Sequence, residues 1–531
     1  MPVIGTLSLL LLYTPFCFRA DAHPGRNAVL LTCATTTGGV LSRYSASKSA
    51  LSNPVQSVLT LTVLSASVAA LVTSVLFITA RLRTRFSSPW AQFLIFPSTW
   101  TTLWVTMAYL SPVGYLSTWS VVNVPDAYRW LIPIFGPSIK DWIAAAWAVV
   151  VADMLASWYM GKQHNAIIDV DEDEQSNSNP VNRLLGLMLI SLTIPSFFFY
   201  NPLPQSSSLD AVEFSTPVSV GCVNPAFRSS KHHIPTIDDF IHEIRTLQAQ
   251  AKVLLLPEGA IRFDSPADRD VGLAKIRDVL TGAYVGVSFE ETFPDPSDER
   301  GVKSLKRTGV AVISQYSEEP HLVYYKRHLV PFAESFSLRH STLPPTLFDI
   351  PLQAPKGVSK EKWSPKEGTT RPLSITSSIC LDFATPSPFS ELVGRPSLIL
   401  APARTWDQTV GYSMWLQAKQ RAEEVGGILL WCDGGEGGVS GVAGPGLDDI
   451  AQVGIGSFVR KIGVEYPFND RRTLYAKFRS LFLIVVWLPI VIPFSHDISV
   501  RRIGLHLRNV IGAFRRRPAH SQIETPTNLL D

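Results

Sequence analysis

Long apolar runs crowd the first two hundred residues of this chain, and they constrain its fold more than any other feature. A helix needs roughly 20 mostly apolar residues to cross a bilayer, because its backbone polar groups must be satisfied within the segment. The segments that approach this standard are Val3 to Phe18, Asn27 to Leu41, Pro54 to Ala80, Trp90 to Leu110, Trp142 to Met160 and Leu184 to Tyr200. We therefore predict an N-terminal transmembrane helical domain over residues 1–205, with about five or six spans.

Two of these segments are weaker than the others. Val3 to Phe18 is short, so it is either a first span or the apolar region of a signal peptide. A basic region and a small-residue cleavage site normally flank such a signal, and neither stands out here, which favours a span. Asn27 to Leu41 is short and rich in threonine and glycine, which makes it the least certain span.

Basic residues predict how these spans are oriented. Arg81, Arg83 and Arg85 lie together directly after the third segment, and short loops with such clusters usually face the cytosol. Counting the later spans forward from this loop places residues 210–470 on the lumenal or extracytoplasmic side. The chain is therefore expected to be a multi-pass integral membrane protein.

A further apolar run lies near the C-terminus. Leu481 to Phe494 is short and contains two prolines, but it predicts a C-terminal transmembrane helix over residues 475–495. Residues 496–531 contain several arginines, as expected of a basic cytosolic tail. The mixture of arginine with apolar residues fits either an amphipathic helix on the membrane surface or a solvated tail.

Residues 210–470 have the pattern of a separate, water-soluble domain. Short runs rich in valine, isoleucine and leucine alternate with helical stretches such as Thr236 to Gln250, and this pattern predicts an α/β sandwich of layered sheets covered by helices. VAVISQY and HLVYYKRHL flank Ser317 to Pro320 and predict a hairpin.

Composition argues against nucleic-acid binding and against a metal site built from cysteines. The net charge of +3, without a nucleic-acid motif, argues against nucleic-acid binding. The five cysteines are widely spaced, so they predict neither a disulfide framework nor a metal site and leave the redox compartment open. We expect no metal and no cofactor.

Three reactive side chains each follow a predicted strand. Glu258 follows the run LLLP, Lys326 ends VYYK, and Cys380 ends SITSSIC. A thiol at the end of a strand can act as a nucleophile, although a single cysteine there is more often a small core residue. A single glutamate or lysine after a strand is usually a surface residue.

The order and context of the three residues resemble a known family. The strings LLLPEGAI, YYKRHLVPFAE and SICLDF resemble the Glu, Lys and Cys motifs of the nitrilase, or carbon–nitrogen hydrolase, superfamily, and the likeness extends from Val218 to about Val464. HLVPFAE with apolar segments on both sides resembles the apolipoprotein N-acyltransferase branch. The resemblance implies an αββα catalytic domain with Glu258, Lys326 and Cys380 as the catalytic triad.

In that branch a phospholipid donates a fatty acyl group to the cysteine, and an amine-bearing lipoprotein or small molecule accepts it. The resemblance therefore implies a membrane N-acyltransferase whose Glu334 supports catalysis in the pocket. At the nucleophile the branch usually has Cys-Tyr-Glu, whereas this chain has Cys380, Leu381 and Asp382, so Asp382 is expected to keep the acidic role at shorter reach. A membrane-tethered amidase or nitrilase with the same triad, and a non-catalytic binding protein on the same fold, are the alternatives.

Overall fold

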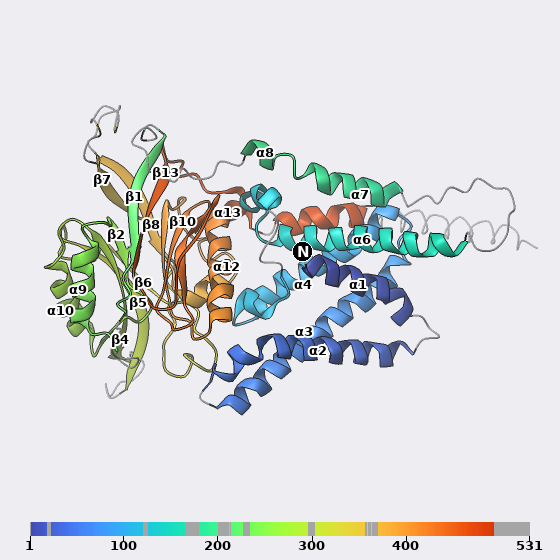
Figure 1. Cartoon of the computed structure of the whole chain (residues 1–531), viewed down its shortest axis with the longest axis horizontal. Coiled ribbons are helices and arrows are strands. Elements are labelled where there is room, and N and C mark those ends of the chain that lie inside the picture. Colours follow the sequence, from blue (N-terminus) through green and yellow to red (C-terminus); the bar gives the residue numbers. More distant parts are fainter. Residues whose placement is uncertain are drawn as a thin grey trace, which may run out of the picture.

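The computed structural model describes residues 2–18, 23–51, 53–120, 126–164, 180–199, 212, 214–226, 234–295, 303–355, 358, 363, 370–479 and 481–492. Figure 1 shows an elongated molecule with a bundle of helices at one end and two stacked β-sheets at the other. The predicted tail over residues 496–531 lies outside the described residues.

The bundle is formed by the N-terminal part of the chain. Its helices are α1 (Pro2–Cys17), α2 (Pro24–Lys48), α3 (Pro54–Arg83), α4 (Pro89–Leu110), α5 (Ile132–Phe135), α6 (Ser138–His164), α7 (Pro180–Ser191) and α8 (Ser196–Phe199), with the short 3₁₀ helices η1 (Gly114–Ser117) and η2 (Asp126–Leu131) between α4 and α5. Proline begins α2, α3 and α4, because its fixed φ suits the first helical turn and its missing N–H needs no partner there. Most of each apolar segment predicted from the sequence therefore lies in a helix.

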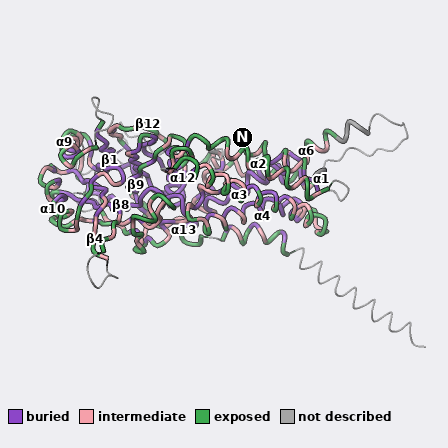
Figure 2. Tube along the Cα trace, turned by 90° about the horizontal axis from the view of Figure 1, so that it is seen from below, coloured by how far each residue is buried: buried purple, intermediate pink, exposed green. Residues whose placement is uncertain are grey.

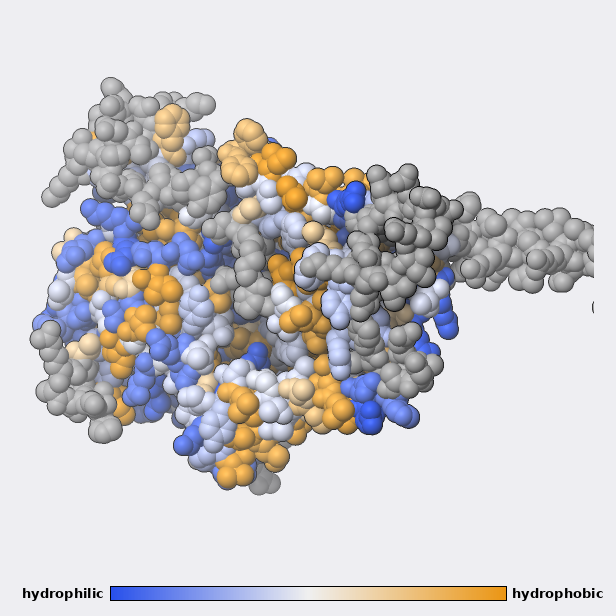
Figure 3. Space-filling model, turned by 45° about the vertical axis from the view of Figure 1, so that its right-hand side comes forward, coloured by the Kyte–Doolittle hydropathy of each residue, from blue (hydrophilic) through white to orange (hydrophobic). Residues whose placement is uncertain are grey.

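Not all of these helices meet the requirements for a membrane span. Among the described residues, two are long and apolar enough to cross a bilayer, Pro54–Arg83 and the combined segment Pro180–Phe198. Val3–Pro15 and Leu481–Ile492 are apolar but shorter. Hydrophobic side chains gather on the surface of the bundle in Figure 3, and the exposed apolar residues of α3 include Leu59 and Val63. The larger number of spans stays a prediction.

The apolar run near the C-terminus returns to the bundle. The short helix α13 (Leu474–Phe478) precedes the helix Leu481–Ile492, which packs against α4. Ser98 donates a hydrogen bond to the carbonyl of Val486, and the indole N–H of Trp487 donates one to Thr102 at 2.9 Å. Segments far apart in the sequence thus share one helical core.

The middle of the chain forms two sheets. The first sheet contains β1 (Ser215–Cys222), β2 (Val253–Leu255), β3 (Ile261–Phe263), β4 (Tyr284–Pro294), β5 (Ser304–Ser314), β6 (Leu322–Tyr325) and β13 (Phe458–Glu465) in the order β13-β1-β2-β4-β5-β6, with β3 beside β4. The second contains β7 (Phe348–Gln353), β8 (Thr370–Ser377), β9 (Leu398–Ala403), β10 (Ile428–Asp433), β11 (Val439–Gly444) and β12 (Leu447–Val453) in the order β12-β11-β10-β9-β8-β7.

Helices cover the outer faces of this sandwich. Figure 1 shows α9 (Ile237–Leu247) and α10 (Pro266–Arg277) outside the first sheet and α12 (Gln408–Val425) between the second sheet and the bundle. Buried residues run along many of the strands in Figure 2, because the two sheets pack face to face and helices cover their outer faces. The predicted α/β sandwich is therefore present.

Local predictions in this region agree with the structure. β5 and β6 pair antiparallel across the predicted hairpin at Ser317 to Pro320. α9 lies within the predicted helix, and Thr236 caps it by accepting a hydrogen bond from the Asp239 N–H. Because the Asp239 side chain bonds back to the N–H of Thr236, the two residues form a capping box.

The expectation that the cysteines form no disulfide framework was wrong for one pair. Cys222 and Cys432 form a disulfide with an S–S distance of 2.05 Å, although 210 residues separate them in the sequence. Spacing along the chain gave no sign of this pair, because the two cysteines meet only when the two sheets stack.

Candidate active site

The triad predicted from the sequence comes from three loops. Glu258 lies in the turn after β2, where its N–H donates a hydrogen bond to the carbonyl of Ala403 at the end of β9. Lys326 directly follows β6, and Cys380 begins the 3₁₀ helix η4 (Cys380–Ala384) after β8. The structure brings all three residues together between the ends of the two sheets.

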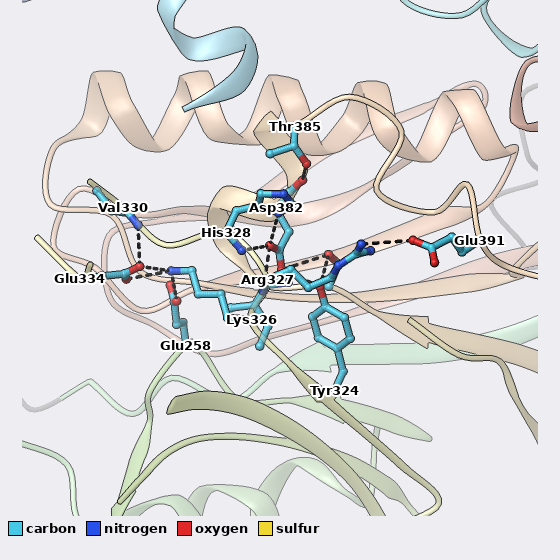
Figure 4. Close-up of polar contacts among 12 residues, drawn as sticks. Glu258, Tyr324, Lys326, Arg327, His328, Val330, Glu334, Asp382, Thr385 and Glu391 are labelled. Carbon is cyan, nitrogen blue, oxygen red and sulfur yellow. Dashed lines mark hydrogen bonds and ion pairs between the residues drawn. The ribbon is translucent and has the colours of Figure 1, made fainter. Parts of the chain in front are cut away.

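Lys326 is the centre of this group. Its Nζ lies 2.6 Å from Glu258 Oε1 and 2.8 Å from each carboxylate oxygen of Glu334. Figure 4 shows Glu258 and Glu334 directed toward this ammonium. Glu334 is held in place because the N–H of Val330 also donates to it at 2.8 Å. The Lys326 side chain is fully buried, whereas 23% of the Glu334 side chain is exposed, so the group opens to its surroundings beside Glu334.

Cys380 lies against this pair of charges. Its sulfur lies close enough to the Glu258 carboxyl and to the backbone N–H of Arg404 for both groups to act on its pKa. Cys380 is only 6% exposed and has a φ of 42°, in the left-handed region that residues with a Cβ rarely adopt. Backbone strain of this kind occurs often at functional sites. Here it turns the chain sharply at the end of β8 and directs the thiol toward Glu258.

Electrostatics in the buried group set the protonation states. Burial raises the pKa of Cys380 well above its usual value, and Glu258 adds to this effect while Lys326 opposes it. Burial also raises the pKa of Glu258, against the effect of Lys326. Burial lowers the pKa of Lys326, but the carboxylates outweigh that effect and raise it overall. The resting group thus holds a neutral thiol, an ammonium and a carboxylate able to take a proton.

Asp382 makes contacts different from those expected of a pocket residue. Its side chain is buried and accepts hydrogen bonds from the N–H groups of His328 at 2.8 Å and Arg327 at 3.2 Å, and from the Tyr324 hydroxyl at 2.8 Å (Figure 4). The N–H of Ile379 donates to it at 3.2 Å. Asp382 therefore ties the turn that carries Cys380 to the loop that carries Lys326, which is a positioning role.

Sequence reasoning missed a second carboxylate of this kind. Asp433, at the end of β10, accepts hydrogen bonds from the N–H of Thr405 at 2.9 Å and from its hydroxyl at 2.7 Å. This contact fixes the loop in which Arg404 directs its N–H at the Cys380 sulfur. Asp433 follows the apolar run ILLWC just as Glu258 follows LLLP, so the same sequence signal could have identified it.

Within the described ranges, no three or more His, Cys, Asp or Glu side chains are grouped so that they could hold a metal ion. The reactive side chains that meet here are the Cys380 thiol, the Lys326 ammonium and the carboxyl groups of Glu258 and Glu334.

Comparison with known proteins gives similar structures but no similar sequence. No protein-family model matches the chain, and no curated protein is significantly similar to it. Among solved structures, Saccharomyces cerevisiae Nit3, a member of branch 10 of the nitrilase superfamily, is 16% identical with a TM-score of 0.36, over 49% of this chain and 93% of its own.

A carbon–nitrogen hydrolase from Helicobacter pylori is 12% identical with a TM-score of 0.30, over 54% of this chain and 99% of its own. The C. elegans NitFhit protein is 14% identical with a TM-score of 0.29, over 53% of this chain and 65% of its own. The structural neighbours are thus nitrilase-superfamily proteins. At these identities and TM-scores, the likeness itself decides neither the family nor the activity of this chain.

Proposed function

We propose that this protein is a membrane N-acyltransferase that moves a fatty acyl group from a phospholipid to an amine through a thioester on Cys380. The observation that carries this proposal is the meeting of Cys380, Glu258 and Lys326 in one buried group. The nitrilase-type triad motifs in the sequence give the same assignment of roles.

The first half-reaction forms the thioester. Glu258 takes the thiol proton of Cys380 as the sulfur attacks the ester carbonyl of the phospholipid. The Lys326 ammonium stabilises the resulting oxyanion, an interaction typically worth about 3 to 4 kcal/mol. When the tetrahedral intermediate collapses, the C–O bond breaks and the proton passes from Glu258 to the leaving alcohol of the lysophospholipid.

The second half-reaction forms the amide. The amine of the acceptor attacks the thioester carbonyl, Lys326 again stabilises the oxyanion, and Glu258 takes a proton from the attacking nitrogen. Collapse breaks the C–S bond, and the Cys380 sulfur regains the proton. The acceptor is an amine-bearing lipoprotein or small molecule, and the reaction requires neither a cofactor nor nucleic acid.

The helical bundle supports a place in the membrane. α3 and the segment Pro180–Phe198 are long and apolar enough to span a bilayer, and the shorter helix Leu481–Ile492 packs beside α4. We propose that the bundle is multi-pass and that the sandwich faces the lumenal or extracytoplasmic side. The Cys222–Cys432 disulfide supports this orientation, because disulfides persist mainly in oxidising compartments.

A carbon–nitrogen hydrolase is the alternative supported by the same residues. Glu258, Lys326 and Cys380 would form the same acyl-enzyme, and water rather than an amine would then release the acid. The large apolar bundle favours a lipid substrate, since one helix suffices to tether a hydrolase. A non-catalytic binding protein has no need for a strained, buried cysteine beside a glutamate and a lysine.

Mass spectrometry of the intact protein tests the proposal. The full-length protein is incubated with membranes and, separately, with phosphatidylcholine vesicles that carry palmitoyl and oleoyl chains, and its mass is measured before and after treatment with hydroxylamine. We expect a long-chain acyl adduct that hydroxylamine removes and that is absent in Cys380→Ala. Full acyl-transfer activity in Cys380→Ala would exclude the mechanism, and an adduct with a short or polar acyl group would favour the hydrolase.

A further inference from the structure

The disulfide between Cys222 and Cys432 crosses the sandwich. Cys222 is the last residue of β1 in the first sheet, and Cys432 lies in β10 of the second sheet. Both side chains are completely buried. The bond therefore joins the facing sheets covalently inside the core.

One end of the disulfide lies beside the strand that leads to Glu258. Cys222 pairs in parallel register with Leu255, and the N–H of the next residue, Val223, donates to the Leu255 carbonyl at 2.8 Å. Glu258 follows Leu255 after two intervening residues, Leu256 and Pro257. The position of Cys222 thus sets the starting point of the turn that carries the base.

The other end lies beside the loop that contacts the nucleophile. Cys432 pairs in parallel register with Pro402 in β9. The next residue, Ala403, accepts the hydrogen bond from the Glu258 N–H at 3.2 Å, and Arg404 directs its N–H at the Cys380 sulfur. Each cysteine is therefore close to a strand end that holds a part of the candidate active site.

We propose that the Cys222–Cys432 disulfide is a positioning brace that holds the Glu258 turn and the Arg404 loop in register around Cys380. This proposal rests on the proposed function, because it assigns Glu258 and Cys380 their catalytic roles. Displacements of about 1 Å at reacting groups can slow an enzyme roughly 100-fold, so a bond between the two sheets at this point affects the rate of acylation.

Noncovalent contacts support the same region without the bond. The side-chain N–H of Asn224 donates to the carbonyl of Asp433 at 3.4 Å, and a Cβ added to Gly434 would come within 2.6 Å of Pro257. We therefore expect the sheets to stay stacked when the cysteines are replaced, so that a loss of activity in a folded variant reports on geometry. Because both cysteines are completely buried, reductants in solution do not reach the bond while the domain stays folded.

Peptide mapping tests whether the bond between Cys222 and Cys432 exists. The full-length protein is denatured without reductant, alkylated with iodoacetamide and digested. We expect Cys222 and Cys432 to appear in one linked peptide pair, which separates only after reduction, and the peptides of Cys33 and Cys380 to carry the alkyl group. Alkylation of Cys222 and Cys432 without reductant would overturn the proposal, whatever the enzymatic activity.

The double variant Cys222→Ala, Cys432→Ala tests the positioning role, with Cys33→Ala on the surface of α2 as the matched control. We expect a folded protein whose Cys380 acylation is roughly 10- to 100-fold slower and whose pH profile for Cys380 alkylation by iodoacetamide is displaced. The control keeps the wild-type values. A second pair, Cys222→Val with Cys432→Ala, fills the core without a bond and is used if the first pair unfolds.

Alkylation by iodoacetamide needs no lipid, so it tests the brace even if the acyl donor is not a phospholipid. Failure of the proposed function would abolish acylation in the wild type and leave the effect on alkylation intact. Variants with the wild-type pH profile and the wild-type acylation rate would show that the disulfide has no positioning role.

Discussion

At the scale of single residues, the site depends on one lysine shared by two glutamates. Lys326 is fully buried, and both Glu258 and Glu334 form ion pairs with its ammonium. A buried charge is tolerated only when it is paired and hydrogen-bonded, and this arrangement meets both conditions. Burial, together with the negative charges of Glu258 and Glu334, raises the pKa of Cys380 and keeps the thiol protonated until a substrate arrives.

Replacing the base tests its role directly. Glu258→Gln keeps the shape of the side chain but removes its ability to take a proton, so we expect formation of the acyl-enzyme to slow by roughly 10²- to 10⁴-fold. Single-turnover acylation followed by intact mass measures this rate, and the exposed Glu319→Gln serves as the control. An unchanged rate in Glu258→Gln would remove Glu258 from the mechanism.

The pH dependence of acylation provides a second test. Glu258 acts as the base only when it is deprotonated, and burial raises its pKa. As the pH decreases, we therefore expect the rate of acylation to begin to fall at a higher pH than the pKa of an ordinary glutamate would give. The negative charge of Glu334 contributes to this raised pKa. Glu334→Gln is therefore expected to move the acid limb of the profile to lower pH. An acid limb that stays in place would mean that Glu258 does not control it.

At the scale of structural elements, residues outside the turn that carries the nucleophile hold this turn in its conformation. The positive φ of Cys380 is unfavourable for a residue with a side chain. The Asp382 carboxylate offsets this strain by accepting hydrogen bonds from Ile379 in its own turn and from His328 and Tyr324 near the end of β6. η4 thus depends on β6 for its shape.

The contacts of Asp382 with Ile379, His328 and Tyr324 form a clamp on the turn that carries Cys380. Two substitutions, one mild and one severe, test this clamp. Tyr324→Phe removes one hydrogen bond to Asp382, which costs about 1 kcal/mol of the free energy of unfolding. Asp382→Asn replaces an accepting oxygen by a donating N–H₂ group that faces other donors, so we expect a larger loss of stability and an acylation rate lower by roughly 10-fold or more. Thermal unfolding and single-turnover acylation measure the two effects. Equal, small effects of both substitutions would contradict the clamp.

At the scale of the whole molecule, the bundle contacts the sandwich through buried charges. Glu423 on α12 lies 3.4 Å from Arg129 and 3.9 Å from Lys140, which both belong to the bundle. On the same helix, Arg421 pairs with Glu424 at 2.8 Å and donates a hydrogen bond to the Thr385 carbonyl directly after η4. This contact region between the bundle and the sandwich, the junction, therefore extends to the turn that carries Cys380.

Close packing extends the same connection. Gly114 in η1 has a φ of 54°, and a Cβ at this position would come within 2.1 Å of the Ala384 carbonyl oxygen at the end of η4. Trp406, near the Arg404 loop, donates a hydrogen bond to the carbonyl of Ala46 in α2 at 3.2 Å. The bundle thus touches the candidate active site from two sides.

The buried Glu424 at the junction makes the free energy of unfolding depend on pH. Burial raises the pKa of Glu424 to about 7, above the 4.5 of an ordinary glutamate. Between these values the folded protein binds a proton that the unfolded chain releases, so the Glu424 contribution is full below pH 4.5 and is lost as the pH rises through about 7. The change is on the order of 3 kcal/mol.

Thermal unfolding at pH 5 and pH 8 measures this effect in the wild type and in Glu424→Gln. We expect the wild type to lose stability between the two pH values and the variant, which stays neutral, to lose less. A variant with the same pH dependence as the wild type would show that another group is responsible.

The sequence by itself determined the broad plan of this protein. Apolar segments such as Pro54 to Ala80 predicted helices, and alternating runs predicted the sandwich, because length and periodicity are local properties of a chain. The positions of Glu258, Lys326 and Cys380 after strands also came from local pattern, together with the family resemblance. Strand ends carry exposed loops, so polar residues there can be identified without a structure.

The tertiary structure decided which residues meet. The Cys222–Cys432 disulfide, the clamp of Asp382 on the loop after β6, and the contact of Asp433 with Thr405 all join segments that the sequence keeps apart. Each of these contacts depends on how two sheets stack or on which loops lie at the same sheet edge. Such relations are set by long-range packing, which leaves no periodic or spacing signal in a single sequence.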